Sequence, residues 1–179
     1  MTRPVNVLFV CTANICRSPF MELLAREIAG PGAAVEFASA GTHGFRDHPM
    51  DEVMAGTLAP RGIDGSGGFR SRALTAEMVD EADLVLTAEA AHRTFILDDH
   101  PGSFRKVFTL GQFAEAVRVA DPSLTGRDLL EVVGERRGAA DASLDVDDPY
   151  SRGPEAAATS AGLIEGRVRA VLSALLGAK

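Results

Sequence analysis

Short apolar runs alternate with longer helical patterns along most of this chain. Four runs have the length and composition of buried strands, and they lie at residues 5–10, 33–38, 83–87 and 106–110. Stretches with helical periodicity separate these runs, as the crossover connections of a parallel sheet require. The alternation therefore predicts an α/β fold, in which a four-stranded parallel sheet is covered by helices on both faces.

Caps and breakers give the expected helix boundaries. The first helix is predicted over residues 19–29, with Ser18 as its cap, Pro19 in its first turn and Gly30 at its end. The other helices are predicted at 47–60, where Val53, Met54 and Leu58 share one side, and at 75–80, 88–97, 112–120, 125–142 and 154–176.

Length, charge and cysteine content exclude several classes of protein. A chain of 179 residues without a linker is expected to form one domain over residues 1–179. Its two cysteines and four histidines lack the spacing of metal ligands, so we expect no metal and no other cofactor. The net charge of −7 argues against nucleic acid or an anionic membrane as a partner. No apolar segment has the length of a membrane span or the pattern of a signal peptide, which predicts a cytoplasmic protein.

One segment joins the first strand to the first helix and carries chemistry, namely Cys11-Thr12-Ala13-Asn14-Ile15-Cys16-Arg17-Ser18-Pro19. A thiol, five spacer residues and an arginine around this turn aim successive backbone amides into one hollow, and the positive end of the helix adds to them. Such a hollow binds a phosphate-like dianion, and the planar guanidinium of Arg17 meets two of its oxygens at once. The same field favours the thiolate form of Cys11. Residues 12–18 thus predict a phosphate-binding loop after the first strand, with Cys11 as its nucleophile.

This loop, Ser39-Ala40-Gly41-Thr42 and the late Asp148-Pro149-Tyr150 occur in the order seen in the low-molecular-weight protein tyrosine phosphatases, a family that the chain resembles. The family loop usually reads Cys-x-Gly-Asn-x-Cys-Arg-Ser-Pro, and Ala13 departs from it where glycine is usual. We expect a small effect of this extra β-carbon on the loop. The resemblance covers residues 5–120 and 145–176, and a helical insertion is expected around residues 121–144.

The resemblance implies hydrolysis of phosphotyrosine in proteins through a phosphocysteine, without a cofactor. Cys11 would attack phosphorus while Arg17 and the loop amides hold the equatorial oxygens. A nearby carboxylic acid must protonate the leaving oxygen. The residues alone leave Asp145, Asp147 and Asp148 as candidates for this acid, and the resemblance selects Asp148.

Other residues are expected to support the loop. Ser18 should donate a hydrogen bond to the Cys11 sulfur, in addition to capping the helix. Asn14 tolerates a left-handed backbone, and the resemblance implies that it braces the loop together with Ser39. In relatives, a thiol at the position of Cys16 traps the oxidised nucleophile as a disulfide and so protects it.

Selectivity is expected to come from the walls of the site. A thiol at the bottom of a cleft reaches a phosphate on a long flat stem, and apolar or aromatic side chains should line that cleft. Ile15, Phe45 and Tyr150 are the candidates for this wall, with a core position as the alternative for Phe45. Phosphoarginine phosphatases that resemble the family tend to carry threonine where this chain has Ile15, so Ile15 favours phosphotyrosine. Ser151 stands where most close family members have a second aromatic residue.

Three alternatives remain open at this stage. A phosphoarginine phosphatase would have the same fold and loop. An arsenate reductase would use further cysteines for electron relay, and this chain has none after Cys16. A phosphoprotein-binding module without turnover would have no use for both Cys11 and Asp148.

Overall fold

Four parallel strands form the central sheet of the computed structural model, which describes residues 3–65, 67–136 and 138–177. Strand β1 pairs with β2 on one side and with β3 on the other, and β4 adds to β3. The order is therefore β2-β1-β3-β4, which confirms the predicted four-stranded parallel sheet. The strands are β1 (Val5–Cys11), β2 (Val35–Gly41), β3 (Leu84–Thr87) and β4 (Val107–Thr109).

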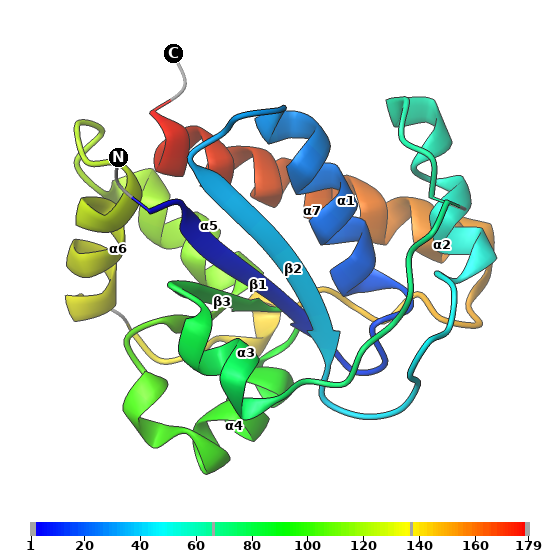
Figure 1. Cartoon of the computed structure of the whole chain (residues 1–179), viewed down its shortest axis with the longest axis horizontal. Helices are drawn as coiled ribbons and strands as arrows, with labels where there is room; N and C mark the ends of the chain where they lie inside the picture. Colours follow the sequence, from blue (N-terminus) through cyan, green and yellow to red (C-terminus); the bar gives the residue numbers. More distant parts are fainter. Residues whose placement is uncertain (1–2, 66, 137, 178–179) are drawn as a thin grey trace.

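Helices lie on both faces of this sheet (Figure 1). They are α1 (Arg17–Ala29), α2 (Glu52–Gly56), α3 (Ala76–Glu81), α4 (Ala90–Asp99), α5 (Leu110–Val119), α6 (Gly126–Glu135) and α7 (Gly153–Leu176). Three short 3₁₀ turns complete the described helical structure, at Ala59–Arg61, Pro101–Ser103 and Ala142–Leu144.

Alternate residues of β1 build two separate cores, because successive side chains of a strand point to opposite faces of the sheet. Val7 and Phe9 pack in the larger core, which holds buried residues of α1, α5 and α7. Leu8 and Val10 pack in the smaller core, with buried residues of α3 and α4. Since β1 is buried on both faces, its sequence is a continuous apolar run rather than an alternating one.

The register of the sheet brings the carboxyl ends of the strands to one edge. Cys11, the last residue of β1, lies opposite Gly41, the last residue of β2. Val10 lies opposite Thr87, where β3 ends. Residues 12–16, 42–43 and 88–89 therefore leave the sheet at the same edge, where ligands bind in open α/β folds.

Two predicted helices differ from the structure. The helix expected at 47–60 is only the short α2, capped by Asp51, whose side chain accepts a hydrogen bond from Met54 N at 3.0 Å. Asp47 lies before it with φ of 60°, outside any helix. Met54 and Leu58 are buried, whereas Val53 is exposed, so the prediction that the three share one side was wrong for Val53.

The helix expected at 125–142 is also shorter, because α6 ends at Glu135. The carbonyls of Gly138 and Ala139 accept hydrogen bonds from the Gln112 side chain, at 2.7 and 3.4 Å, instead of continuing a helix. Leu129 and Val133 of α6 are buried in the larger core. That this segment is an insertion stays a prediction.

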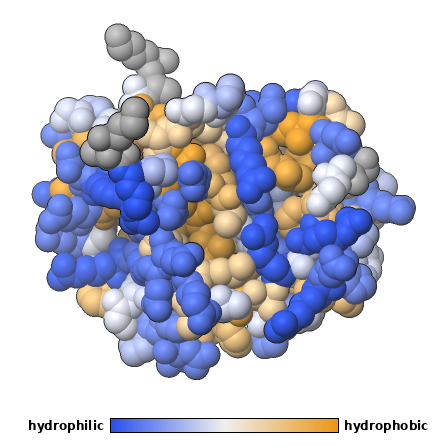
Figure 2. Space-filling view, in the orientation of Figure 1, coloured by the Kyte–Doolittle hydropathy of each residue, from blue (hydrophilic) through white to orange (hydrophobic). Residues whose placement is uncertain are grey.

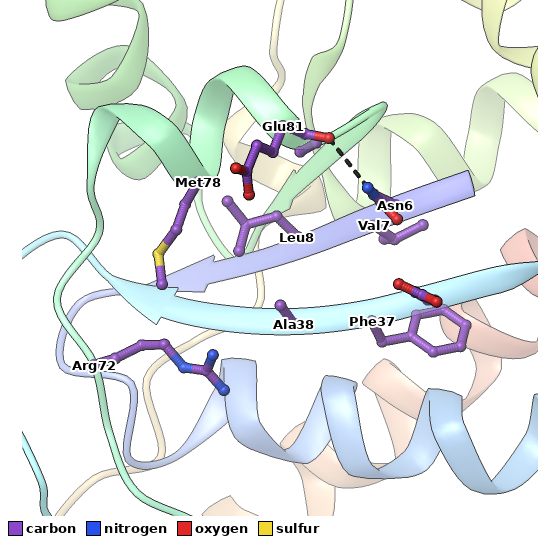
Figure 3. Close-up of a pocket in the computed structure, with 10 residues that line it drawn as sticks. Asn6, Val7, Leu8, Phe37, Ala38, Arg72, Met78 and Glu81 are labelled. Carbon is purple, nitrogen blue, oxygen red and sulfur yellow. Dashed lines mark hydrogen bonds between the residues drawn. The ribbon is translucent and has the colours of Figure 1, made fainter. Parts of the chain in front are cut away.

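An open cleft lies on the face of the sheet that α3 and α4 cover only in part. Figure 2 shows apolar surface near the middle of this view, bordered by polar residues. A cleft of about 260 Å³ lies there, with Leu8, Ala38 and Met78 in its lining and Asn6 and Glu81 at one end (Figure 3). None of its lining residues belongs to the loop after β1. Among the described helices, none is long and apolar enough to cross a membrane.

Candidate active site

The loop after β1 is held by its carbonyl groups. The Cys11 carbonyl accepts a hydrogen bond from Thr42 N at 2.9 Å, and the Thr12 carbonyl accepts one from His43 N at 2.8 Å. At the far end of the loop, the Ile15 carbonyl accepts from Asp51 N at 2.8 Å. Within the described part of the chain, the amides of residues 12–16 donate to no protein acceptor. Their N–H groups are therefore available to an anion, as in other anion-binding nests.

Gly41 lies directly against this loop. A β-carbon built on Gly41 would lie 2.7 Å from the Thr12 carbonyl oxygen, 2.8 Å from the Ala13 carbonyl carbon and 2.9 Å from Asn14 N. All three are backbone atoms, so only glycine fits here without moving the loop. Close packing against the loop thus explains why the segment Ser39-Ala40-Gly41-Thr42 has glycine at position 41. Ala13 lies next to Gly44, where an added β-carbon would be 3.5 Å from the Ala13 Cβ.

The thiol of Cys11 lies beside the hydroxyl of Ser18, with 3.0 Å between Sγ and Oγ. This is the hydrogen bond that the sequence predicts. The predicted capping role of Ser18 was wrong, because α1 begins at Arg17 with Cys16 as its first flanking residue. Ser18 is the second residue of the helix, and its side chain points to the sulfur instead of to the first free amides.

Asn14 braces the loop from inside. It is fully buried with φ of 56°, in the left-handed region that asparagine tolerates better than most residues. Its Nδ2 donates to Ser18 Oγ and to Ser39 Oγ, both at 2.8 Å, and its Oδ1 accepts from Arg72 N at 2.9 Å. The two predicted support residues, Ser18 and Ser39, therefore both accept hydrogen bonds from the side chain of Asn14. Ser39 in turn donates to the buried carboxylate of Glu22.

Arg17 is 1% exposed, and its guanidinium is partly engaged. Its Nη1 forms an ion pair with Glu89 and donates to the carbonyl of Val146 at 2.8 Å. Its Nη2 lies 3.3 Å from Asp148 Oδ2. Its Nε is buried and has no hydrogen-bond partner among the described residues. Leaving a charged donor unpaired in the interior is costly, so a ligand acceptor is expected at Nε.

The segment that carries Asp148 reaches the site from far along the sequence and is fixed on both sides. Val146 N donates to the Ala88 carbonyl at 2.9 Å, after β3. The Asp147 carbonyl accepts from Ser160 Oγ of α7 at 3.0 Å. Asp148 follows, with a side chain that is 48% exposed and accepts a hydrogen bond from Tyr150 N at 3.2 Å.

The three candidate acids are now distinguished by position. Asp148 faces Arg17, as described above. The carboxylate of Asp145 accepts from Ala90 N at 2.8 Å, at the start of α4, and burial raises its pKa. Asp147 is exposed and contributes only its backbone to a described contact. Of these three aspartates, Asp148 is therefore the one that the fold brings to Arg17, where Glu89 also lies.

Cys16 is buried at the beginning of α1, in a setting different from that of Cys11. Burial strongly raises the pKa of the Cys16 thiol, and the negative charges of Asp51 and Asp148 raise it further. Cys16 is thus held in its uncharged form. Both cysteines are free thiols in this structure.

The three predicted wall residues lie in different surroundings. Ile15 is half-buried against the larger core. Phe45 is 43% exposed and packs on His48, with 4.7 Å between the ring centroids, so the alternative of a core position was wrong. Tyr150 is 49% exposed, two residues after Asp148. Their role as a substrate wall stays a prediction.

Several contact residues of this site were missed from the sequence. Glu89 binds Arg17, and Ser71 Oγ donates to the Phe45 carbonyl at 3.1 Å. His92 Nε2 lies 2.9 Å from Thr12 Oγ1. The backbone amide of Arg72 binds Asn14. Of these residues, only Glu89 could have been proposed from the sequence, because it follows a predicted strand and so lies at the carboxyl edge of the sheet.

Known proteins share both the sequence pattern and this geometry. The family model for low molecular weight phosphotyrosine protein phosphatase matches residues 6–139. The chain belongs to this family. The match confirms the resemblance that was based on the loop and on Ser39-Ala40-Gly41-Thr42, and members of the low molecular weight phosphatase family are cysteine-dependent hydrolases.

The relatives of this chain include proteins named as tyrosine phosphatases and one named as an arginine phosphatase. The low molecular weight protein-tyrosine-phosphatase Etp of Escherichia coli K12 is 38% identical over 128 residues, which cover 72% of this chain and 84% of Etp. A protein-arginine-phosphatase of Geobacillus stearothermophilus is 35% identical over 121 residues, which cover 66% of this chain and 79% of that protein.

Solved structures of the same family match nearly the whole chain. The low molecular weight protein tyrosine phosphatase from T. tengcongensis has a TM-score of 0.74 and 28% identity, over 96% of this chain and 99% of that chain. The YwlE arginine phosphatase from Geobacillus stearothermophilus has a TM-score of 0.73 and 27% identity, over 94% of this chain and 90% of that chain.

Proposed function

We propose that this phosphatase hydrolyses phosphotyrosine in proteins through a phosphocysteine on Cys11. One observation carries the proposal: among the described residues, the buried Nε of Arg17 has no protein partner, and it lies next to a loop whose amides donate to none of them either. Nε and Nη2 of a guanidinium form a fork that fits two phosphate oxygens. Residues 12–18 would bind the remaining charge of the phosphoryl group through backbone N–H groups and the helix N-terminus.

In the first step, the Cys11 thiolate attacks phosphorus in line with the leaving oxygen. The S–P bond forms as the P–O bond to the tyrosine ring breaks, and Asp148 gives its proton to the departing phenolate oxygen. Ser18, 3.0 Å from the sulfur, would stabilise the thiolate before the attack. A bound phosphate dianion competes with Asp148 for Nη2 of Arg17 and, by its negative charge, favours the protonated acid.

In the second step, water hydrolyses the phosphocysteine. The Asp148 carboxylate takes a proton from the attacking water, the S–P bond breaks, and Cys11 leaves as thiolate with release of inorganic phosphate. Arg17 and the loop amides stabilise the equatorial oxygens in both steps, because they are already oriented before the charge develops. Asn14 and Ser39 would keep the loop in this conformation through their shared hydrogen bond of 2.8 Å.

A phosphotyrosine substrate is favoured over phosphoarginine by the residues around the loop. Ile15 offers an apolar contact to an aromatic ring, and the exposed rings of Phe45 and Tyr150 are available for stacking. Phosphoarginine is the second candidate, because relatives and structural neighbours of this chain include protein-arginine-phosphatases. We assign Cys16 the task of trapping oxidised Cys11 as a disulfide. A reducing cytoplasm is the compartment that suits a thiol nucleophile.

The test compares one preparation on peptides with phosphotyrosine, phosphoserine and phosphoarginine, in the presence of a chelator. We expect phosphotyrosine to be hydrolysed with the highest kcat/KM, and Cys11→Ser to be inactive on every substrate. Faster hydrolysis of the phosphoarginine peptide would make phosphoarginine the preferred substrate instead of phosphotyrosine. Activity of Cys11→Ser would refute the proposal as a whole.

The leaving group tests Asp148 separately. Asp148→Asn should reduce kcat/KM for phenyl phosphate, which reports the first step alone, by about 10²–10⁴-fold, the usual contribution of a general acid. For dinitrophenyl phosphate, whose phenolate leaves without a proton, the same variant should lose far less. An equal loss on both substrates would show that Asp148 does not protonate the leaving group.

A further inference from the structure

His92 connects the phosphate loop to the segment that holds Arg17. It lies in the first turn of α4 and is 6% exposed. Its Nδ1 lies 3.2 Å from Glu89 N, and its Nε2 lies 2.9 Å from Thr12 Oγ1. A backbone N–H can only donate, so Nδ1 is the acceptor and the ring proton of a neutral imidazole is on Nε2. Nε2 therefore donates to the Thr12 hydroxyl.

The surroundings of His92 keep its imidazole ring neutral at pH 7. The pKa of His92 is lowered to about 4, mainly by burial and secondly by the positive charge of Arg17. Glu89 and Asp148 act in the opposite direction, and His43 in the same direction as Arg17. A second proton would have to sit on Nδ1, where the Glu89 amide already points.

Through its two contacts, His92 reaches the residue next to the proposed nucleophile and the residue that pairs with the guanidinium. Thr12 directly follows Cys11, and its carbonyl is tied to His43 N. Glu89 has its main chain held by His92 and its carboxylate paired with Nη1 of Arg17. Since Thr12 Oγ1 accepts from His92, its own proton remains free to donate to a second acceptor.

We propose that His92 is a positioning residue, which holds Thr12 and Glu89 so that the loop and Arg17 keep the geometry that binds a phosphoryl group. The inference rests on the proposed function of the loop and adds a residue to it. His92 itself contacts neither phosphorus nor the leaving group. Its effect is on how tightly the transferred group is held, which a merely structural residue would not change.

The experiment is a double-mutant cycle with Thr12→Val and His92→Leu. Hydrolysis of para-nitrophenyl phosphate gives kcat and KM, competition by inorganic phosphate gives Ki, and thermal unfolding gives Tm. Each single variant should lower kcat/KM and raise Ki by about tenfold, as for one lost, partly buried hydrogen bond. The double variant should lose no more than the larger single effect, because both remove the same contact.

Conservative variants and a matched control sharpen the result. Thr12→Ser keeps the hydroxyl, and His92→Gln keeps a neutral donor and acceptor, so both should retain most of the lost affinity for phosphate. Thr94→Val makes the same chemical change on the exposed side of α4 and should leave kcat/KM and Ki unchanged.

The outcomes separate this inference from the proposed function. Independent, additive losses in the cycle would overturn the positioning role, as would a lower Tm with unchanged kcat/KM and Ki. If His92→Leu does not fold, an unaltered Ki in the exposed-site variant Thr12→Val overturns it as well. An inactive wild-type protein, or an active Cys11→Ser, would instead refute the proposed function.

Discussion

Replacement of Gly41 by alanine tests whether the phosphate loop depends on contact with β2. The added β-carbon would lie 2.7 Å from the Thr12 carbonyl oxygen, whereas ordinary contacts begin near 3.4 Å. Gly41 cannot withdraw, because its N–H donates to the Arg72 carbonyl at 2.9 Å and its carbonyl accepts from Leu74 N at 2.8 Å. The loop must therefore move by about 0.7 Å.

A shift of this size has consequences for stability and for catalysis. Overpacking typically lowers the free energy of unfolding by about 1–3 kcal/mol. A misplacement of about 1 Å in a positioned site costs about a hundredfold in rate, so we expect kcat/KM of Gly41→Ala to fall by about 10- to 100-fold. The Ki of inorganic phosphate should rise with it, because the loop amides move together. Urea unfolding and hydrolysis of para-nitrophenyl phosphate measure the two effects.

A glycine elsewhere in the chain provides the control. Gly166 is exposed on α7, and a β-carbon there meets nothing within 4 Å. Gly166→Ala should raise the free energy of unfolding by up to about 1 kcal/mol through helix propensity and leave kcat/KM unchanged. A Gly41→Ala variant that binds phosphate and turns over like the wild type would refute the argument that this contact sets the loop geometry.

Three further predictions concern neighbouring side chains. The pKa of His92 is lowered to about 4 from about 6.5 in the unfolded chain, so the unfolded state binds more protons between these values and stability falls as the pH drops. From pH 7 to pH 5, His92 should cost about 2 kcal/mol of the free energy of unfolding, a loss that urea titrations would find absent in His92→Gln. Because the raised pKa keeps Cys16 uncharged, iodoacetate should place one carboxymethyl group on the protein, on Cys11; modification of Cys16 in the intact fold, detected by mass spectrometry, would contradict this. Ser71→Ala releases the Phe45 carbonyl and should raise KM for a phosphotyrosine peptide severalfold while leaving Ki for inorganic phosphate unchanged; equal changes in both constants would mean that Ser71 acts on the loop instead of the wall.

The part of the site that the sequence predicts is the part that is local in the chain. Cys11 and Ser18 are seven residues apart on one strand–loop–helix turn, so their hydrogen bond follows from the segment itself. The same reasoning placed the helix start two residues late, because a capping pattern cannot distinguish a cap from a hydroxyl that faces a sulfur. The alternation of strands and helices likewise predicts the sheet, since it depends only on the order of elements.

The partners of Arg17 could not be predicted, because they come from distant parts of the chain. Glu89 is 72 residues away and Val146 is 129 residues away. No periodicity or spacing indicates which carboxylate or carbonyl the tertiary fold brings to a given guanidinium. Asp148 was selected by resemblance alone, and the residues had left Asp145 and Asp147 open for the same reason. The end of α6 was missed because Gln112, from another helix, binds the carbonyls that would have continued it.

The fixed position of Val146 determines how the carboxyl group of Asp148 reaches the reaction. Asp148 is two residues from a backbone anchored to both Ala88 and Arg17, and its preceding carbonyl is anchored to α7. Two residues of extended chain span at most about 7 Å, so these anchors limit how far the acid can move from Arg17. The carboxyl group already lies 3.3 Å from Arg17 Nη2, so no closure of this segment is needed to bring the two together.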